Sequence, residues 1–307
     1  MTPSPVEAAR DAYEHTRRDL FPFRFEAWLA LGLVAFLDQC GRAGGAGSPP
    51  PGSGIGTQVH PGLPELPPFE RVGDWFAGHL ALIVGAAAVG IALLLALSAL
   101  ILWVNSRGVF IYMDDVARGR TEFSRPWHEH AERASSYFVW SFGLAVGLVG
   151  AMFALLAIGA AAVLSVVRGG MLTGVFVSGM LALMIPVFVL LLMAGVVASI
   201  GLRDFAAPLQ WKMGLGCGDA VRLLVSLVRA DPGPFLVYLL LKVAFAIAAT
   251  IVITVGGCLT CCLGFLPVVK QTLFQPAFYF ERAWSLHFLR RLGYDLVTRE
   301  PEEPAAG

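Results

Sequence analysis

The chain has 307 residues, of which 57% are hydrophobic and 14% are charged, and its formal net charge at pH 7 is zero. An average soluble domain carries about a quarter charged residues, so this composition excludes an ordinary globular enzyme. The balanced charge and the lack of a basic stripe also give no support to nucleic-acid binding.

The N-terminal residues 1–20 are expected to form a cytoplasmic tail. They contain no compact apolar core followed by a small-residue cleavage site, so a secretory signal is not expected. The first candidate transmembrane helix, residues 21–40, is the weakest, because Arg24, Glu26 and Asp38 lie near its ends.

Residues 41–75 contain nine glycines and seven prolines. Such a composition buries too little apolar area to offset the entropy of ordering, so we interpret it as a flexible outer loop. A polyproline recognition segment around Pro49, Pro50 and Pro51 is the alternative.

Four further segments are apolar over more than the about 20 residues that a helix needs to cross a hydrocarbon core. We predict spans at residues 76–104, 137–167, 171–202 and 235–257.

The sixth candidate span, residues 263–280, is shorter and interrupted by Pro267, Lys270 and Pro276. The chain then ends in residues 294–307, which we expect to be a disordered tail. A six-span transmembrane domain would therefore cover residues 21–293.

Charge asymmetry supports all six spans, because loops rich in Lys and Arg stay in the cytoplasm. With six spans, seventeen of the 22 Lys and Arg residues lie on one side and only Arg42, Arg71 and Arg168 lie on the other. We therefore expect a multi-pass protein of the bacterial inner membrane with both termini in the cytoplasm.

The inner connections carry helical periodicity. Asp219, Arg222, Ser226 and Arg229 recur at helical spacing, which predicts an amphipathic helix at the membrane interface. We interpret residues 126–134 and 281–292 as interfacial helices of the same kind. The predicted fold class is all-α: a polytopic bundle of six transmembrane helices in three hairpins, joined by cytoplasmic amphipathic helices.

The last two predicted spans are the least lipid-like. An intramembrane lysine is costly unless it faces protein or water, and Lys270 is predicted near the midplane. The pattern predicts either a polar binding pocket or ion path, or a structural hydrogen-bond cluster, with the second favoured. The candidate residues are Lys242, Thr250, Thr254, Lys270, Gln271 and Gln275.

Cysteines and histidines offer two weaker candidates. Four cysteines are predicted on the outer face, either as partners in a disulfide or as small residues at a helix turn: Cys40, Cys258, Cys261 and Cys262. Metal binding by His128 and Glu132 is disfavoured against a solvated helix. We expect no metal, cofactor or catalytic residue, since none of the common nucleotide, hydrolase or metalloprotease motifs is present.

Short motifs carry a resemblance to other membrane proteins. These are Arg107-Gly108-Val109-Phe110, residues 115–127, Arg203-Asp204-Phe205-Ala206-Ala207-Pro208 and residues 275–293. The chain resembles uncharacterised bacterial six-span membrane proteins and is distantly similar to the membrane domain attached to glycerophosphodiester phosphodiesterases. The resemblance implies the helical arrangement and not the hydrolytic activity.

The function expected from these patterns is a non-enzymatic membrane scaffold or accessory protein. Its partners would be the lipid bilayer and membrane or cytoplasmic proteins. The alternative is a small-solute or ion transporter or channel that uses the polar face of spans five and six.

Overall fold

The computed structural model describes residues 3–40, 69–169, 171–260, 264, 266 and 268–297. All regular structure in these residues is helical. The elements are α1 (Pro5–Leu20), α2 (Phe25–Gln39), α3 (Phe69–Arg118), α4 (Ser124–Glu129), α5 (Ala131–Gly169), α6 (Met171–Ile200), the π-helix η1 (Gly201–Ala206), α7 (Ala207–Met213), α8 (Cys217–Ala230), α9 (Pro232–Leu259), α10 (Val269–Leu273) and α11 (Gln275–Arg291).

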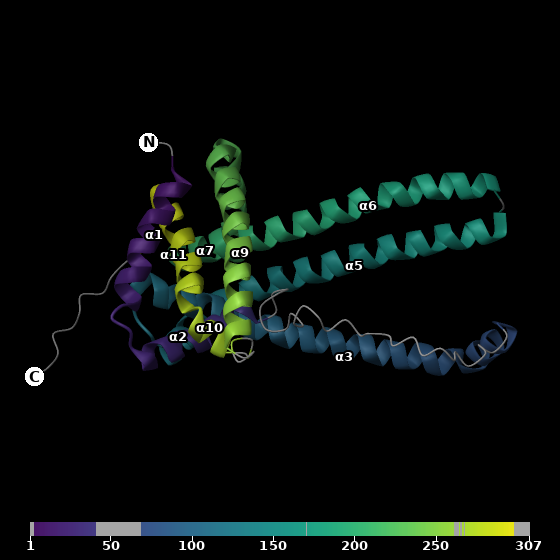
Figure 1. The fold of residues 1–307 in the computed structure, drawn as a ribbon, viewed down its shortest axis with the longest axis horizontal. Coiled ribbons are helices and arrows are strands. Elements are labelled where there is room, and N and C mark those ends of the chain that lie inside the picture. Colours follow the sequence, from purple (N-terminus) through teal and green to yellow (C-terminus); the bar gives the residue numbers. More distant parts are fainter. Residues whose placement is uncertain are drawn as a thin grey trace, which may run out of the picture.

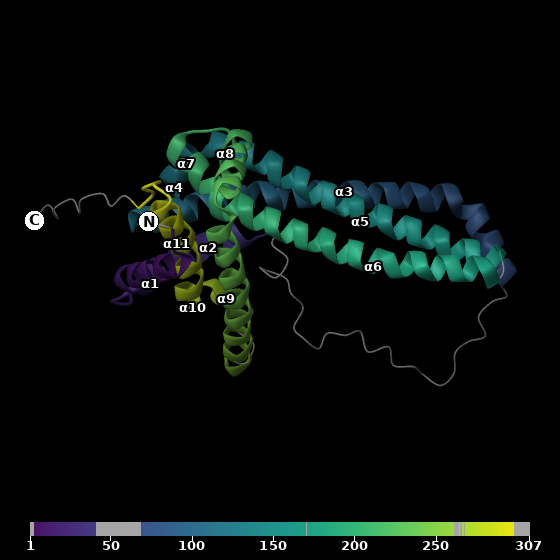
Figure 2. The same cartoon turned by 90° about the horizontal axis from the view of Figure 1, so that it is seen from above.

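The molecule has a long arm and a helical base. Helices α3, α5 and α6 run side by side and form the arm, whereas α1, α4, α7, α8 and α11 gather at one end of it and form the base (Figures 1 and 2). Helix α9 starts in the base and runs across the direction of the arm in both views. The carboxyl end of α3 and the amino end of α5 therefore lie in the base with the short helices.

Four of the described helical segments are long and apolar enough to cross a membrane: Val84–Arg118, Ala131–Ser165, Val177–Met213 and Pro232–Leu259. Their apolar side chains point outward, as with Leu93 and Leu94, which are 66% and 68% exposed. Contiguous exposed apolar surface of this extent is not tolerated in water. The chain is thus a multi-pass membrane protein.

The two weakest predicted spans are not confirmed. Helix α2 has 15 residues, and residues 263–280 contain the short α10 and the start of α11. The predicted set of three hairpins is not confirmed either. In the arm, α5 runs antiparallel to both α3 and α6, and α9 lies across the direction of all three.

The connections differ from the prediction at several points. Residues 1–20, the predicted cytoplasmic tail, contain α1, which packs along α11. The helix predicted from the spacing of Asp219, Arg222, Ser226 and Arg229 is confirmed as α8, and its place at the membrane interface stays a prediction. Helix α3 begins at Phe69, inside the predicted loop 41–75, and residues 41–68 lie outside the described residues. The same holds for most of the predicted tail 294–307, although Leu296 is fully buried.

Helix α2 packs closely on the carboxyl-terminal half of α3. The side-chain amide of Asn105 donates to the carbonyl oxygen of Asp38 over 2.5 Å, and Gly108 faces the backbone of Leu37 and Asp38. A methyl group at Gly108 would lie 2.5 Å from the carbonyl carbon of Leu37. The absence of a side chain at Gly108 allows this approach.

We predict that Gly108→Ala separates α2 from α3. The added methyl meets backbone that cannot rotate away, and such overpacking costs about 1–3 kcal/mol. Thermal unfolding in detergent, followed by tryptophan fluorescence, should show a lower midpoint. Gly90→Ala on the same helix is the control, since a Cβ there meets nothing within 4 Å. Equal midpoints for the two variants would refute the close contact.

Candidate functional site

The arm enters the base through a π-helix. Helix α6 continues directly into η1, whose wider turns carry Arg203 and Asp204 into the interior, where both are almost fully buried. Isolated π-turns inside longer helices occur frequently at functional sites. Here the π-helix places two opposite charges next to each other at the junction of arm and base.

Asp38, at the end of α2, lies between two arginines. Its carboxylate accepts hydrogen bonds from the guanidinium of Arg203 and, over 2.7 Å, from that of Arg282 on α11. Arg282 also donates to the main-chain carbonyl oxygen of Arg203 over 3.0 Å. The side chains of Asp38 and Arg282 are completely inaccessible to solvent.

Asp204 and Glu281 extend these contacts to α9. Lys242 Nζ lies 2.7 Å from Asp204 Oδ2 and 3.1 Å from Glu281 Oε1. Tyr238 donates its hydroxyl to Asp204 over 3.1 Å, and Arg203 donates to Glu281 over 3.0 Å. Helix α9 is therefore held at its first turns by groups on η1 and α11.

We call the six charged groups the buried ion-pair network: Asp38, Arg203, Asp204, Lys242, Glu281 and Arg282. Three carboxylates balance three cations, so the network as a whole is neutral. Removing a charge from water costs several kcal/mol unless a partner lies close by. Exact neutrality with short contacts is the arrangement that makes such burial tolerable.

Two smaller polar clusters lie in the base. Asp114 is fully buried and accepts hydrogen bonds from Arg120 and Trp211 over 2.6 and 3.2 Å. It also forms an ion pair with Arg118 at 3.1 Å and lies 3.3 Å from His130 Nε2. Of the neighbouring His128 and His130, His130 contacts this aspartate and His128 is exposed. Among the described residues, no group of three or more His, Cys, Asp or Glu side chains could hold a metal ion.

The second cluster joins α1, near the N-terminus, to α11. His15 Nε2 lies 2.8 Å from Asp19, while His15 Nδ1 lies 3.0 Å from His287 Nε2. Tyr279 donates to Asp19 over 3.0 Å. These bonds fasten α1 along α11, so the N-terminal helix is part of the base.

The predicted polar site is divided by the fold. Lys242 belongs to the buried ion-pair network, while Thr250 lies on the exposed face of α9 and donates back to the carbonyl oxygen of Ala246. Because eight residues advance an α-helix about 80° beyond two full turns, Lys242 and Thr250 lie on different sides of α9. Thr254, four residues further, is half-buried on α9.

The glutamines of the predicted site are both buried. Gln275 donates to the hydroxyl of Tyr112 over 3.0 Å, and Gln271 accepts from the backbone N–H of Val268 at the start of α10. Lys270 is half-buried beside them on α10. The three residues therefore lie close together around α10, apart from Lys242.

The predicted outer cysteines are only partly described. Cys40 and Cys258 are free thiols, and Cys261 and Cys262 lie outside the described residues. Cys217 is also free, and burial raises its pKa to about 11. This thiol is therefore protonated at neutral pH.

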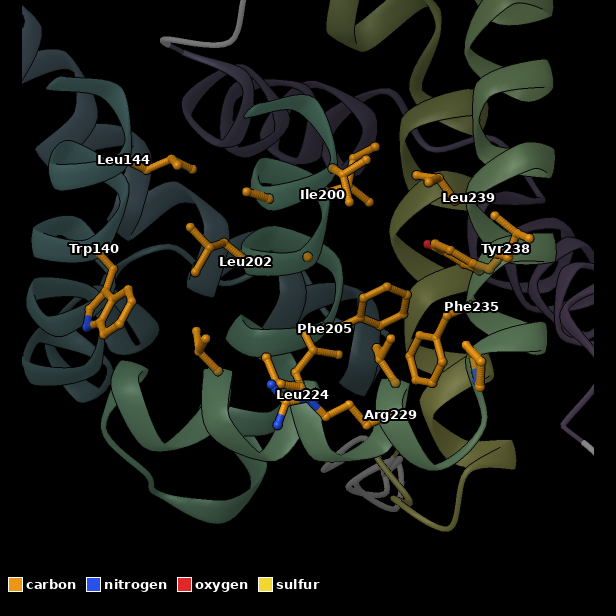
Figure 3. Close-up of a pocket in the computed structure, with 18 of the residues that line it drawn as sticks. Trp140, Leu144, Ile200, Leu202, Phe205, Leu224, Arg229, Phe235, Tyr238 and Leu239 are labelled. Carbon is orange, nitrogen blue, oxygen red and sulfur yellow. The ribbon is translucent and has the colours of Figure 1, made fainter. Parts of the chain in front are cut away.

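A groove of about 1180 Å³ opens beside the π-helix (Figure 3). It lies between α5, α6, η1, α8 and α9, and we call it the α8 groove. Trp140 and Leu144 of α5 line one side, Phe235 and Tyr238 of α9 line the other, and α8 crosses the bottom.

A family model described as "Family of unknown function (DUF7544)" matches residues 3–287. The chain belongs to this family. No curated protein and no solved structure matches the chain. The match spans α1 to α11, so this family member's base and arm both fall within it. The similarity to the membrane domain of the phosphodiesterases stays a prediction.

The sequence patterns of this family member do not identify the buried ion-pair network. By sequence alone, Asp38 is a charge near a helix end, and Arg203 and Arg282 are loop cations. The available signal is the pairing of opposite charges in Arg203-Asp204 and Glu281-Arg282, next to the predicted ends of two spans. Hydropathy alone cannot distinguish such pairs from solvated loop residues.

We predict that Asp38→Asn is strongly destabilising. The substitution leaves Arg203 and Arg282 buried without their carboxylate, and breaking a buried pair in this way costs about 3–5 kcal/mol. The measurement is the midpoint of thermal unfolding in detergent. Asp219→Asn is the control, because its pair with Arg222 is exposed. If both variants unfolded at the wild-type temperature, the network would not stabilise the fold.

We also predict an acid-dependent loss of stability at His287. Burial, reinforced by the nearby His15, lowers the pKa of His287 to about 4. Between about pH 6.5 and pH 4 the unfolded chain binds a proton at this position and the folded chain does not, so stability falls as pH falls through this range. The free energy of unfolding of His287→Gln should decline less steeply there. His128→Gln, at an exposed histidine, should retain the wild-type slope, and an unchanged slope for His287→Gln would contradict the assignment.

Proposed function

We propose that the chain is a non-enzymatic scaffold or accessory protein of the bacterial inner membrane. In this proposal the apolar arm anchors the base at the cytoplasmic face, where the base holds other proteins. The observation that carries it is that the six charges of the buried ion-pair network bond to one another and join α2, η1, α9 and α11, which come from distant parts of the chain. Such groups maintain a shape and are not directed at a solute.

The proposed orientation rests on the basic residues of the base. Arg17 and Arg18 lie on α1, Arg118 at the end of α3, and Arg290 and Arg291 at the end of α11. Clusters of this kind stay on the cytoplasmic side. Both termini are therefore proposed to be cytoplasmic.

Six crossings remain the proposed topology for the whole chain. Two observations count against the crossing by residues 21–40. Asp38 would lie at its outer end, but it contacts Asn105 at the inner end of the span 76–104, and it pairs with Arg203 and Arg282, which lie at the inner ends of other spans. Their direct ion pairs bring the three residues to one level.

Thiol labelling of intact cells tests this topology. In chains with one cysteine each, we expect a membrane-impermeant maleimide to label Cys258 from outside, and to label Gly119→Cys only after permeabilisation. Gly45→Cys decides the first span, since six crossings require it to be labelled from outside. Protection of Gly45→Cys in intact cells, with labelling after permeabilisation, would remove residues 21–40 from the spans.

The scaffold proposal predicts a partner that contacts the outer face of α1. Val6 and Tyr13 are seven residues apart on one face, and each is 61% exposed. The double variant Val6→Glu and Tyr13→Glu should lose a stoichiometric partner that crosslinks to wild type. Glu14→Gln on the same helix is the control. Retention of the same partner by the double variant would exclude this face, and a wild-type chain without any stoichiometric partner would refute the proposal.

A transporter is the second candidate function. It is favoured by Gln271 Nε2 and Gln275 Oε1, which are buried without a hydrogen-bond partner among the described residues. Proteoliposomes separate the two candidates. Solute flux that is abolished by Lys270→Ala would support transport and contradict the scaffold, whereas the absence of flux would exclude the transporter.

A further inference from the structure

The α8 groove has a lining that is apolar along its length. Val221, Leu224 and Val225 of α8 line it together with Val139 of α5 and Leu236 of α9. Its volume of about 1180 Å³ exceeds the roughly 300–1,000 Å³ that is usual for small-molecule pockets. The space suits a ligand with long apolar chains.

The groove is continuous with surface that faces the bilayer. Val139 and Leu236, at its two sides, are 65% and 59% exposed and belong to segments long and apolar enough to cross a membrane. A molecule in the bilayer can therefore enter from the side without passing through water. Trp140, at the edge, is of the residue type that prefers the headgroup level.

A single positively charged side chain lies among the described residues that line the groove. Arg229, in the last turn of α8, is the charged residue among those that line the groove. Within the described part of the chain no ion pair joins Arg229 to a carboxylate, whereas Arg222 on the same helix pairs with Asp219 at 3.0 Å. The groove thus combines apolar walls with an unpaired positive charge at the membrane interface.

We propose that the α8 groove binds a phospholipid with an anionic headgroup. Its acyl chains lie between α5 and α9, and the headgroup phosphate lies at Arg229. This arrangement satisfies the guanidinium and covers the apolar walls, and it makes a lipid part of the junction between arm and base. The proposal does not depend on the scaffold function.

The groove can be filled by a substitution at a glycine that lines it, without disturbing the packing of α5. Gly143 lines it, and a Cβ built there meets nothing within 4 Å. Gly143→Phe should therefore fill the space while leaving α5 in place. Gly150→Phe is the matched control, because Gly150 is on the same helix, also meets nothing within 4 Å, and lies outside the groove.

The first measurement is native mass spectrometry of delipidated protein with added dioleoyl phosphatidylglycerol or dioleoyl phosphatidylcholine. Wild type and Gly150→Phe should retain one phosphatidylglycerol, and Gly143→Phe should lose it. Arg229→Ala should bind phosphatidylglycerol about fivefold more weakly, the loss of one arginine's attraction to an anionic headgroup. Arg222→Ala should bind as wild type does.

The result that overturns the proposal is equal binding by Gly143→Phe and Gly150→Phe, or equal affinity of wild type for the two lipids. A photo-crosslinking residue at Leu236 gives an independent readout in the membrane. A lipid adduct that Gly143→Phe abolishes supports the proposal. A protein adduct at this position would assign the groove to a partner helix instead.

Discussion

The carboxylate of Asp38, enclosed by the guanidinium groups of Arg203 and Arg282, is the contact on which the rest of the molecule depends. It brings together α2, η1 and α11, which lie far apart in the sequence. Its energy is not that of an isolated pair, because each arginine has a second acceptor in Glu281 or in the Arg203 carbonyl oxygen. A buried charge with several short contacts is costly to disturb and fixes one geometry.

The π-helix and the close packing of α2 on α3 both serve this contact. The π-helix carries Arg203 and Asp204 at adjacent positions, from which Arg203 reaches Asp38 on α2 and Asp204 reaches Lys242 on α9. Gly108 and Asn105 bring the end of α2 against α3, which sets the position of Asp38. The junction between arm and base is thus formed by the π-helix η1, the close contact at Gly108 and the buried ion-pair network.

The sequence is informative about helices and much less about their contacts. The four apolar segments and the helical spacing of polar residues in α8 are properties of short stretches of sequence. These helices are therefore predictable from the sequence. The contacts of Asp38 with Arg203 and Arg282 span 165 and 244 positions, and no local pattern contains them. The same limit explains why the sequence assigns Lys242 and Lys270 to one site although Lys242 is paired with Asp204 and Glu281. The α8 groove has no sequence signature because its lining residues come from five separate elements.

A double-mutant cycle between Asp38 and Arg282 tests the central claim most directly. Free energies of unfolding would be measured in detergent for wild type, Asp38→Asn, Arg282→Met and the combined variant. If the two residues form one buried unit, the combined variant loses less than the sum of the single losses, with a coupling of about 0.5–3 kcal/mol or more. Additive losses would mean that the two side chains act independently, and would contradict a junction that depends on their contact.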